Sequence, residues 1–133
     1  MSQAQLEKDN EAVVNAMIAV WEAKDLEGIR ATLAEDIVYQ MHESIDDMTS
    51  ADAVCTAFEP AMAAERVEWE VSRSYAIGSV VINERIDKFY SMPDGKGGTM
   101  DVIAAVAGFF YVKDGKIAMW RDYSIPGRSP EST

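Results

Sequence analysis

Apolar side chains recur every three or four positions in the first part of the chain. Residues 3–23 carry this spacing, which predicts a long amphipathic helix. A second helix is predicted from a cap at Asp25 to residue 33, and a third over residues 51–65. Pro60 is expected to kink this third helix or to end it early, because proline lacks the N–H that a helix interior needs. About three helices are therefore predicted in the N-terminal half.

The spacing changes to alternation in the rest of the chain, which is typical of half-buried strands. A first strand is predicted at residues 37–42, between the second and third helices. The later strands are predicted at residues 66–77, 80–91, 99–112 and 117–125. The segments between them, "GS", "PDGKGG" and "KDGK", are rich in turn-forming residues, which favours hairpins.

This order of elements predicts an α+β domain with a cone-shaped, curved mixed or antiparallel sheet and helices on one face. A strand face of such a cone can look into a cavity, where buried polar groups have to be paired. We expect residues 1–125 to form this single domain and residues 126–133 to form a flexible tail.

Composition narrows the range of partners. At 133 residues, 48% of them hydrophobic, the chain can bury one core without disulfides or metals. Its 12 basic and 23 acidic residues give a net charge of -11, which disfavours nucleic acid and anionic membranes. The polar N-terminal residues do not resemble a signal peptide, and no apolar run is long enough to span a membrane. A cytoplasmic protein is therefore predicted.

The strand at residues 80–91 carries polar residues on a face that could be buried. Asn83, Arg85, Asp87 and Phe89 share one face of "VINERIDKFY", because successive side chains of a strand alternate. An isolated Arg-x-Asp pair at the surface would contribute only about 0–1 kcal/mol and would need no further explanation. On a face that looks into the cone, the same pair would belong to a site.

Two other strands carry matching chemistry. In "WRDYSI", Trp120, Asp122 and Ser124 share a face, so a second carboxylate lies beside an aromatic ring. In "VYQMHE", Tyr39 and Met41 share a face, which can bring a phenol to the same opening of the cone. The three strands together favour a site with two carboxylates, a guanidinium and a phenol.

These motifs resemble those of the limonene-1,2-epoxide hydrolase family, which has a nuclear-transport-factor-2-like (SnoaL-like) fold. "NERIDKF" and "GKIAMWRDY", with "AEDIVYQ" upstream, extend the resemblance over nearly the whole chain. It implies a catalytic Asp-Arg-Asp triad of Asp87, Arg85 and Asp122, in which Tyr39 helps to hold a water. In the family an asparagine of the same strand also helps the second Asp to hold this water. The family's Tyr-Gln-Asn reads Tyr-Gln-Met here, with Met41 in place of that asparagine.

The implied reaction explains the residue types. One-step opening of an epoxide to a diol needs a base that takes a proton from water and an acid that protonates the leaving oxygen. Two nearby carboxylates in a poorly solvated pocket resist ionising together, and a planar guanidinium can bind both. The resemblance makes Asp122 the base and Asp87 the acid. It also implies a small apolar epoxide as the substrate, no cofactor, and a homodimer.

The substrate is expected to lie in an apolar pocket. The predicted lining consists of Met41, Asn83, Phe89, Ala104, Val106 and Trp120. Ordinary core packing would explain the apolar members equally well. Asn83 is in addition a candidate substitute for the missing family asparagine, because it faces the same side of its strand as Arg85.

The other reactive residues have structural explanations. Alternation puts His42 on the strand face opposite Tyr39, which predicts a partly exposed structural role. Cys55 lies among apolar residues of the third helix and is expected to be a buried core residue. The acidic residues of "HESIDDMTSAD" lack the spacing of a calcium loop, so no metal is predicted.

Two other functions are compatible with this fold. A SnoaL-like or ketosteroid-isomerase-like enzyme would use one carboxylate to move a proton beside a carbonyl, although Arg85 between two acids suits water activation better. The second is a non-catalytic protein that binds small ligands as a dimer. The replacement of the family asparagine by Met41 favours this function. The dimer is expected to pair through the outer sheet face, which includes Ile86.

Overall fold

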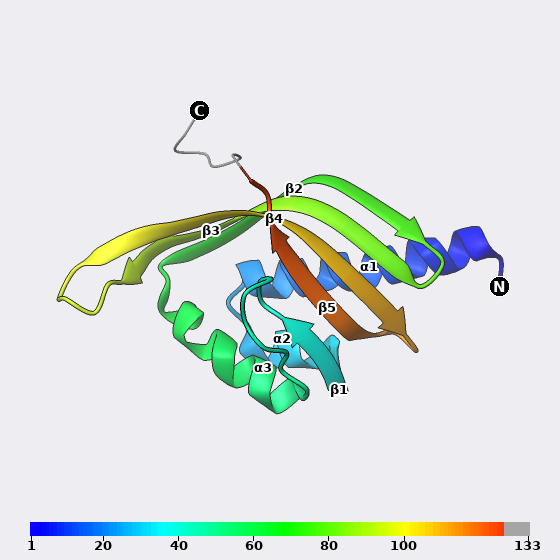
Figure 1. Cartoon of the computed structure of the whole chain (residues 1–133), viewed down its shortest axis with the longest axis horizontal. Coiled ribbons are helices and arrows are strands. Elements are labelled where there is room, and N and C mark those ends of the chain that lie inside the picture. Colours follow the sequence, from blue (N-terminus) through cyan, green and yellow to red (C-terminus); the bar gives the residue numbers. More distant parts are fainter. Residues whose placement is uncertain (127–133) are drawn as a thin grey trace.

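The structure, a computed structural model, describes residues 1–126 of the chain. Five strands form one open, curved sheet, and the helices lie against one of its faces (Figure 1). The predicted α+β class is therefore confirmed. Of the predicted tail, residues 127–133 lie outside the described residues.

Three α-helices begin after residues whose side chains cap them. The oxygens of Ser2, Asp25 and Ser50 each accept an N–H from the first turn of the helix that follows. The third helix ends just before Pro60, as predicted, and the chain continues as a short 3-10 helix. The bounds are α1 (Gln3–Glu22), α2 (Leu26–Ala31), α3 (Ala51–Phe58) and the 3-10 helix η1 (Glu59–Ala63).

The strands lie in the order β1-β5-β4-β3-β2, so the first and last strands of the sequence are neighbours. β1 pairs with β5 in parallel and all other pairs are antiparallel, which makes the sheet mixed. The bounds are β1 (Leu33–Gln40), β2 (Arg66–Ile77), β3 (Val80–Pro93), β4 (Thr99–Lys113) and β5 (Lys116–Ser124).

The predicted bounds of the second helix and the first strand were wrong. β1 begins at Leu33 and ends at Gln40, whereas residues 37–42 were expected, and α2 already ends at Ala31. The pairing of β1 with β5 shifts register between Leu33 and Val38, so alternation is broken inside the strand. This irregularity hides the start of the strand from a search for period-two spacing.

Helix α1 crosses the concave face of the sheet and is fastened at both ends. Near its start the amide of Asn10 donates to the carbonyl oxygen of Gly78, in the turn between β2 and β3, at 3.2 Å. At its end a carboxylate oxygen of Glu22 accepts the backbone N–H of Trp69 at 3.0 Å. Trp21 then stacks on Trp69, with ring centroids 4.9 Å apart. The helix thus fixes β2 and brings indole rings under the sheet.

The other face of the sheet carries no helix within the described chain (Figure 1). Ile86 and Phe109 are half-buried on this outer face, and Tyr123 is exposed there. The rings of Phe109 and Tyr123 meet edge to face with centroids 5.7 Å apart. An apolar surface is therefore available on the outer side of the middle strands.

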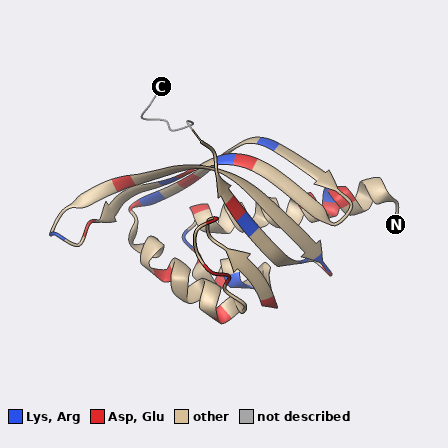
Figure 2. Cartoon of the chain, viewed as in Figure 1, with Lys and Arg blue, Asp and Glu red and all other residues tan. Residues whose placement is uncertain are grey.

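Charged side chains are distributed over helices, loops and strands (Figure 2). The segment between β1 and α3 is acidic, with Glu43, Asp46 and Asp47 exposed. None of the helices in residues 1–126 is long and apolar enough to cross a membrane. The cytoplasmic location stays a prediction. Three charged side chains in the described chain are buried, namely Arg85, Asp87 and Asp122.

Candidate active site

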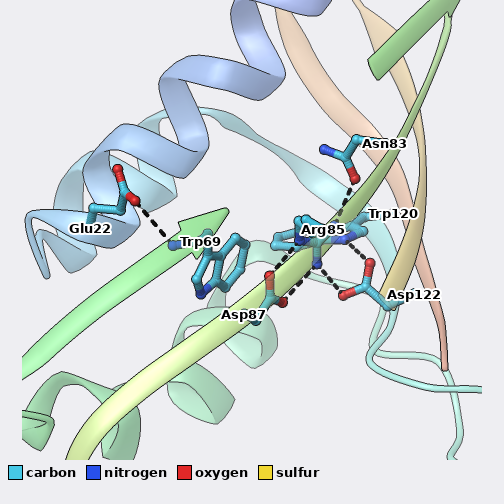
Figure 3. Close-up of polar contacts among 7 residues, drawn as sticks. All are labelled: Glu22, Trp69, Asn83, Arg85, Asp87, Trp120 and Asp122. Carbon is cyan, nitrogen blue, oxygen red and sulfur yellow. Dashed lines mark hydrogen bonds and ion pairs between the residues drawn. The ribbon is translucent and has the colours of Figure 1, made fainter. Parts of the chain in front are cut away.

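The guanidinium of Arg85, on β3, lies between two carboxylates on the concave face of the sheet (Figure 3). Its Nε donates to one oxygen of Asp87 at 2.8 Å, and one Nη donates to the other oxygen at 3.1 Å. The same Nη donates to Asp122, on β5, at 2.8 Å. Arg85 is completely buried, so these bonds replace the water that the cation lost.

Two further side chains complete the polar network. The second Nη of Arg85 donates to the amide oxygen of Asn83 at 2.9 Å. The indole N–H of Trp120 donates to Asp122 at 2.8 Å, on the carboxylate oxygen that Arg85 does not bind. Both Asn83 and Trp120 are buried. The network therefore fixes the orientation of the arginine and of the second carboxylate (Figure 3).

Aromatic rings surround the cation on its remaining sides. Its central carbon lies 4.7 Å from the ring centroid of Trp69, and 5.9 Å from those of Phe110 and Trp120. Rings at these distances attract a cation through their faces. A strand neighbour without a side chain, Gly108, leaves the space that the guanidinium occupies, because a Cβ there would lie 2.4 Å from Arg85 Nη1.

Burial and the cation act on the carboxyl groups in opposite directions. Burial raises the pKa of Asp87 to about 6, against the effect of Arg85. Burial also raises the pKa of Asp122, against Arg85 and the hydrogen bond from Trp120. The pKa of Arg85 is itself raised, because the two carboxylates outweigh the effect of its burial. Burial thus makes the two acids resist ionising together.

A cavity of about 430 Å³ opens beside the triad, under the sheet. Asp87 and Asp122 face it, and almost all of the other lining is apolar or aromatic. Such a cavity suits a small apolar molecule with one reactive group at the carboxylates. Its lining is Trp21, Tyr39, Met41, His42, Ala57, Phe58, Pro60, Ala61, Trp69, Asp87, Phe89, Met92, Val102, Ala104, Val106, Asp122 and Ser124.

The phenol of Tyr39, on β1, lines the same cavity as the two carboxylates. Its ring contacts that of Trp120 with centroids 4.5 Å apart, and the side chain is almost completely buried. Burial, and next the charge of Asp122, raise the pKa of Tyr39 well above its ordinary value. The phenol therefore keeps its proton and can hydrogen-bond a water or ligand in the cavity.

The predicted pocket residues divide into two groups. Met41, Phe89, Ala104 and Val106 line the cavity. Asn83 and Trp120 lie behind its wall, where they contact Arg85 and Asp122 instead. They belong to the support of the triad and not to the lining.

The structure corrects the predicted placement of His42. It lines the cavity together with Tyr39, although alternation puts the two on opposite faces. The reason is that β1 ends at Gln40, so the alternation of a strand no longer applies at residue 42.

Sequence reasoning missed the part of the wall that comes from the helices and from the far end of the β3–β4 hairpin. Trp21 and Phe58 reach the cavity only through helix docking, for which the sequence gives no direct signal. Trp69 could have been found, because it pairs with Asp87 across β2 and β3 and so shares the inner face.

The remaining candidates stay outside the site. Cys55 is buried in the core, as predicted, and burial raises the pKa of its thiol. Within residues 1–126 no group of three or more His, Cys, Asp or Glu side chains could hold a metal ion. A larger hollow of about 570 Å³, between the start of α1 and the end of β2, is open and lies away from the triad.

Comparisons with known proteins identify the family of the chain. The family model described as the limonene-1,2-epoxide hydrolase catalytic domain matches residues 8–125. The chain belongs to this family. The limonene-1,2-epoxide hydrolase family and its nuclear-transport-factor-2-like fold, predicted from the motifs, are therefore confirmed.

Individual relatives extend the comparison. Epoxide hydrolase EphG of Mycobacterium tuberculosis H37Rv is 28% identical over 110 residues, which are 83% of this chain and 69% of EphG. A solved epoxide hydrolase of M. tuberculosis, similar to limonene-1,2-epoxide hydrolase, aligns with a TM-score of 0.76 at 25% identity, over 90% of this chain and 84% of its own.

A more distant protein shares only the architecture. A SnoaL-like polyketide cyclase from Jannaschia sp. CCS1 aligns equally well, with a TM-score of 0.76 over 93% of this chain and 90% of its own. Its sequence is 13% identical, so this likeness shows the fold alone.

Removal of the cation tests the network directly. We expect Arg85→Leu to lower the free energy of unfolding by about 3–5 kcal/mol at pH 8, because it leaves two buried carboxylates without their partner. At pH 5 the loss should be smaller. The carboxyl pKa values of the folded variant would lie above the unfolded values, so protonation stabilises the fold as pH falls. Urea denaturation at both pH values measures the difference.

The control is Arg66→Leu, which removes an arginine whose side chain is 60% exposed in its ion pair with Glu68. This change should cost about 0–1 kcal/mol at either pH. An Arg85→Leu protein as stable as wild type at pH 8 would contradict the view that the network depends on this cation.

Proposed function

We propose that this protein is a cofactor-independent epoxide hydrolase that adds water to a small apolar epoxide in one step. The observation that carries this proposal is the position of Arg85, which binds two cavity-facing carboxylates at once. An acid and a base bound to the same cation can act in the same step, one on the leaving oxygen and the other on the attacking water.

The proposed step balances without a covalent intermediate. Asp122, as the base, takes a proton from water while the water oxygen forms a bond to one epoxide carbon. The bond from that carbon to the epoxide oxygen breaks, and Asp87, as the acid, protonates this oxygen. The product is a diol. Transfer of the proton from Asp122 to Asp87, directly or through water, restores the starting state.

The surroundings of the two acids support this assignment of roles. Asp122 accepts hydrogen bonds from both Arg85 and Trp120, which stabilise its charged form as a base needs. The pKa of Asp87, raised by burial to about 6, leaves a protonated fraction near neutral pH as an acid needs.

Tyr39 is proposed to hold the attacking water together with Asp122. Its protonated phenol lines the cavity and lies within the electrostatic influence of Asp122. Met41 lies at the neighbouring cavity position, where a thioether accepts hydrogen bonds only weakly and donates none. One contact to the water is therefore absent from this site.

Asn83 acts in this proposal through Arg85 and not on the water. Its amide oxygen binds the guanidinium, and the residue lies outside the cavity lining. Its amide nitrogen is buried without a partner in the described chain. Asn83 therefore serves as a positioning residue for Arg85.

The first test is the formation of diols from a panel of terpene and aromatic epoxides. We expect Asp87→Asn and Asp122→Asn each to lower turnover by about 10²–10⁴, because each removes one side of the acid-base pair. Both replacements keep the size of the side chain, and circular dichroism checks that the fold is intact. The matched control, Asp94→Asn in the β3–β4 turn and outside the cavity lining, should have wild-type turnover.

A single turnover in heavy-oxygen water separates the one-step route from a covalent route. The proposal places the label directly in the diol, whereas a label that first enters a protein carboxylate would exclude it. Wild-type protein that opens none of the epoxides would instead favour the non-catalytic ligand-binding function.

A second prediction concerns the missing water contact. We expect Met41→Asn to raise epoxide turnover severalfold, because an amide beside Tyr39 would help to orient the water. The control is Met100→Asn, which changes an exposed methionine at the start of β4 and should have no effect. Steady-state kinetics of the two variants provide the measurement, and unchanged turnover in Met41→Asn would mean that the water is held by other groups.

The outer sheet face is proposed to pair two copies of the chain. Ile86 and Phe109 are half-buried there, and the exposed Tyr123 extends the same apolar surface. A two-fold axis through this face would cover these residues with their own equivalents.

Sedimentation at micromolar concentration tests this pairing. We expect a species of twice the monomer mass of 14.7 kDa. Ile86→Lys should shift it toward monomer, because a charge would enter the apolar interface. Ile77→Lys, at the exposed end of β2, is the control and should leave the dimer intact. A monomeric wild-type protein would contradict the proposal.

A further inference from the structure

Two polar side chains in the cavity wall have no part in the proposed reaction. His42 and Ser124 line the cavity, whose other lining residues are apolar or aromatic apart from Tyr39, Asp87 and Asp122. His42 follows the last residue of β1 by two positions, and Ser124 is the last residue of β5. Both therefore lie where the parallel pair of strands stops. The cavity therefore has a second polar position besides the triad.

The hydrogen bonds of His42 define which of its nitrogens can bind a ligand. The backbone N–H of Ser44 points at Nδ1 of His42 at 3.3 Å, and the hydroxyl of Ser44 lies 2.7 Å from the same nitrogen. Because a backbone N–H can only donate, Nδ1 is the acceptor and the proton of the neutral ring is on Nε2. No residue of the described chain accepts a hydrogen bond from Nε2, so an N–H donor remains for a ligand.

Ser124 contacts the segment that carries His42 and lies two residues after the proposed base. Its backbone N–H donates to Glu43, the residue after His42, at 3.2 Å. The carboxylate of Glu43 also accepts a hydrogen bond from the hydroxyl of Ser124, so the serine oxygen is left as an acceptor. Ser124 follows Asp122 by two positions on the same strand face, which corresponds to about 7 Å along the strand. A ligand group that binds here would lie about that far from the reacting centre.

The charge around this position selects a neutral group. Glu43, Asp46 and Asp47 are exposed on the same segment as His42 (Figure 2), and Asp87 and Asp122 face the cavity from inside. Arg121 pairs with Asp47 at 3.2 Å and is therefore already engaged. A carboxylate or phosphate on the ligand would meet several like charges, whereas a hydroxyl or carbonyl oxygen would not.

We propose that His42 and Ser124 form a subsite for a neutral oxygen of the substrate, about 7 Å from the oxirane. This inference rests on the proposed function and narrows its substrate class to epoxides that carry a hydroxyl or carbonyl group at their far end. The imidazole N–H donates to this oxygen, and the serine oxygen, whose proton goes to Glu43, accepts from it where the ligand carries a hydroxyl. The two side chains determine specificity and take no part in the chemical step.

The test compares two epoxides that differ in one group. The first is a 4-alkyl-1,2-epoxycyclohexane, and the second carries a hydroxyl on the first carbon of the alkyl group. We expect wild type to favour the hydroxylated epoxide by about 3- to 10-fold in kcat/KM, the effect of one or two hydrogen bonds. His42→Phe and Ser124→Ala should each reduce this ratio to one or below. His42→Gln should retain part of it, because the glutamine amide can donate from a similar position.

A matched control is Ser72→Ala, an exposed serine on β2, for which the ratio should equal that of wild type. A wild-type ratio of one or less would overturn the subsite, and so would a ratio that neither His42→Phe nor Ser124→Ala changes.

Binding of the products keeps this test independent of catalysis. Trp21 and Trp69 line the cavity, so quenching of their fluorescence can report binding of the diol and of the triol derived from the hydroxylated epoxide. Tighter binding of the triol by wild type, lost in His42→Phe and Ser124→Ala, supports the subsite even if no epoxide is opened, in which case only the proposed function fails. Equal affinities for diol and triol overturn the subsite.

Discussion

The burial of the Arg85 guanidinium is the constraint on which the inner face of the sheet depends. A cation that leaves water must recover its hydrogen bonds, and Asp87, Asp122 and Asn83 supply oxygens for its Nε and both Nη groups. These groups come from β3 and β5, so β4, which lies between them, must leave space for the guanidinium. Gly108 does so, because any side chain there would collide with the guanidinium. One buried charge thus determines residues on three neighbouring strands.

The sequence predicts this network well because strand alternation is a strong local rule. A period of two places Asn83, Arg85 and Asp87 on one face without any knowledge of the sheet, and it places Trp120 with Asp122 in the same way. The order of elements then implies a concave face on which both strands can meet. Alternation predicts the strand face on which a side chain lies, but not how deeply the side chain is buried. Alternation does not show that Asn83 lies behind the cavity wall, where its amide oxygen binds Arg85.

The parts that could not be predicted are those where alternation fails or does not apply. The β3–β4 register shifts between Phe89 and Met92, with Ser91 at a positive φ of 55°, and this shift turns Met92 into the cavity. His42 reaches the cavity because its strand has already ended. Trp21 and Phe58 reach it through the docking of helices, which tertiary packing decides. A bulge, a strand end and a helix orientation each depend on contacts far away in the sequence.

The charge of the network links its stability to its proposed chemistry. With both carboxylates ionised, one cation faces two anions in a poorly solvated site, and burial raises the pKa of both acids. One bound proton makes the triad neutral, and this is the state that an acid and a base acting together require. In the proposed reaction Asp122 takes a proton from water and Asp87 gives one to the product, so the total charge of the triad would be the same before and after. The positive charge of Arg85 would therefore remain neutralised by one carboxylate throughout. No net charge would have to enter or leave the apolar interior.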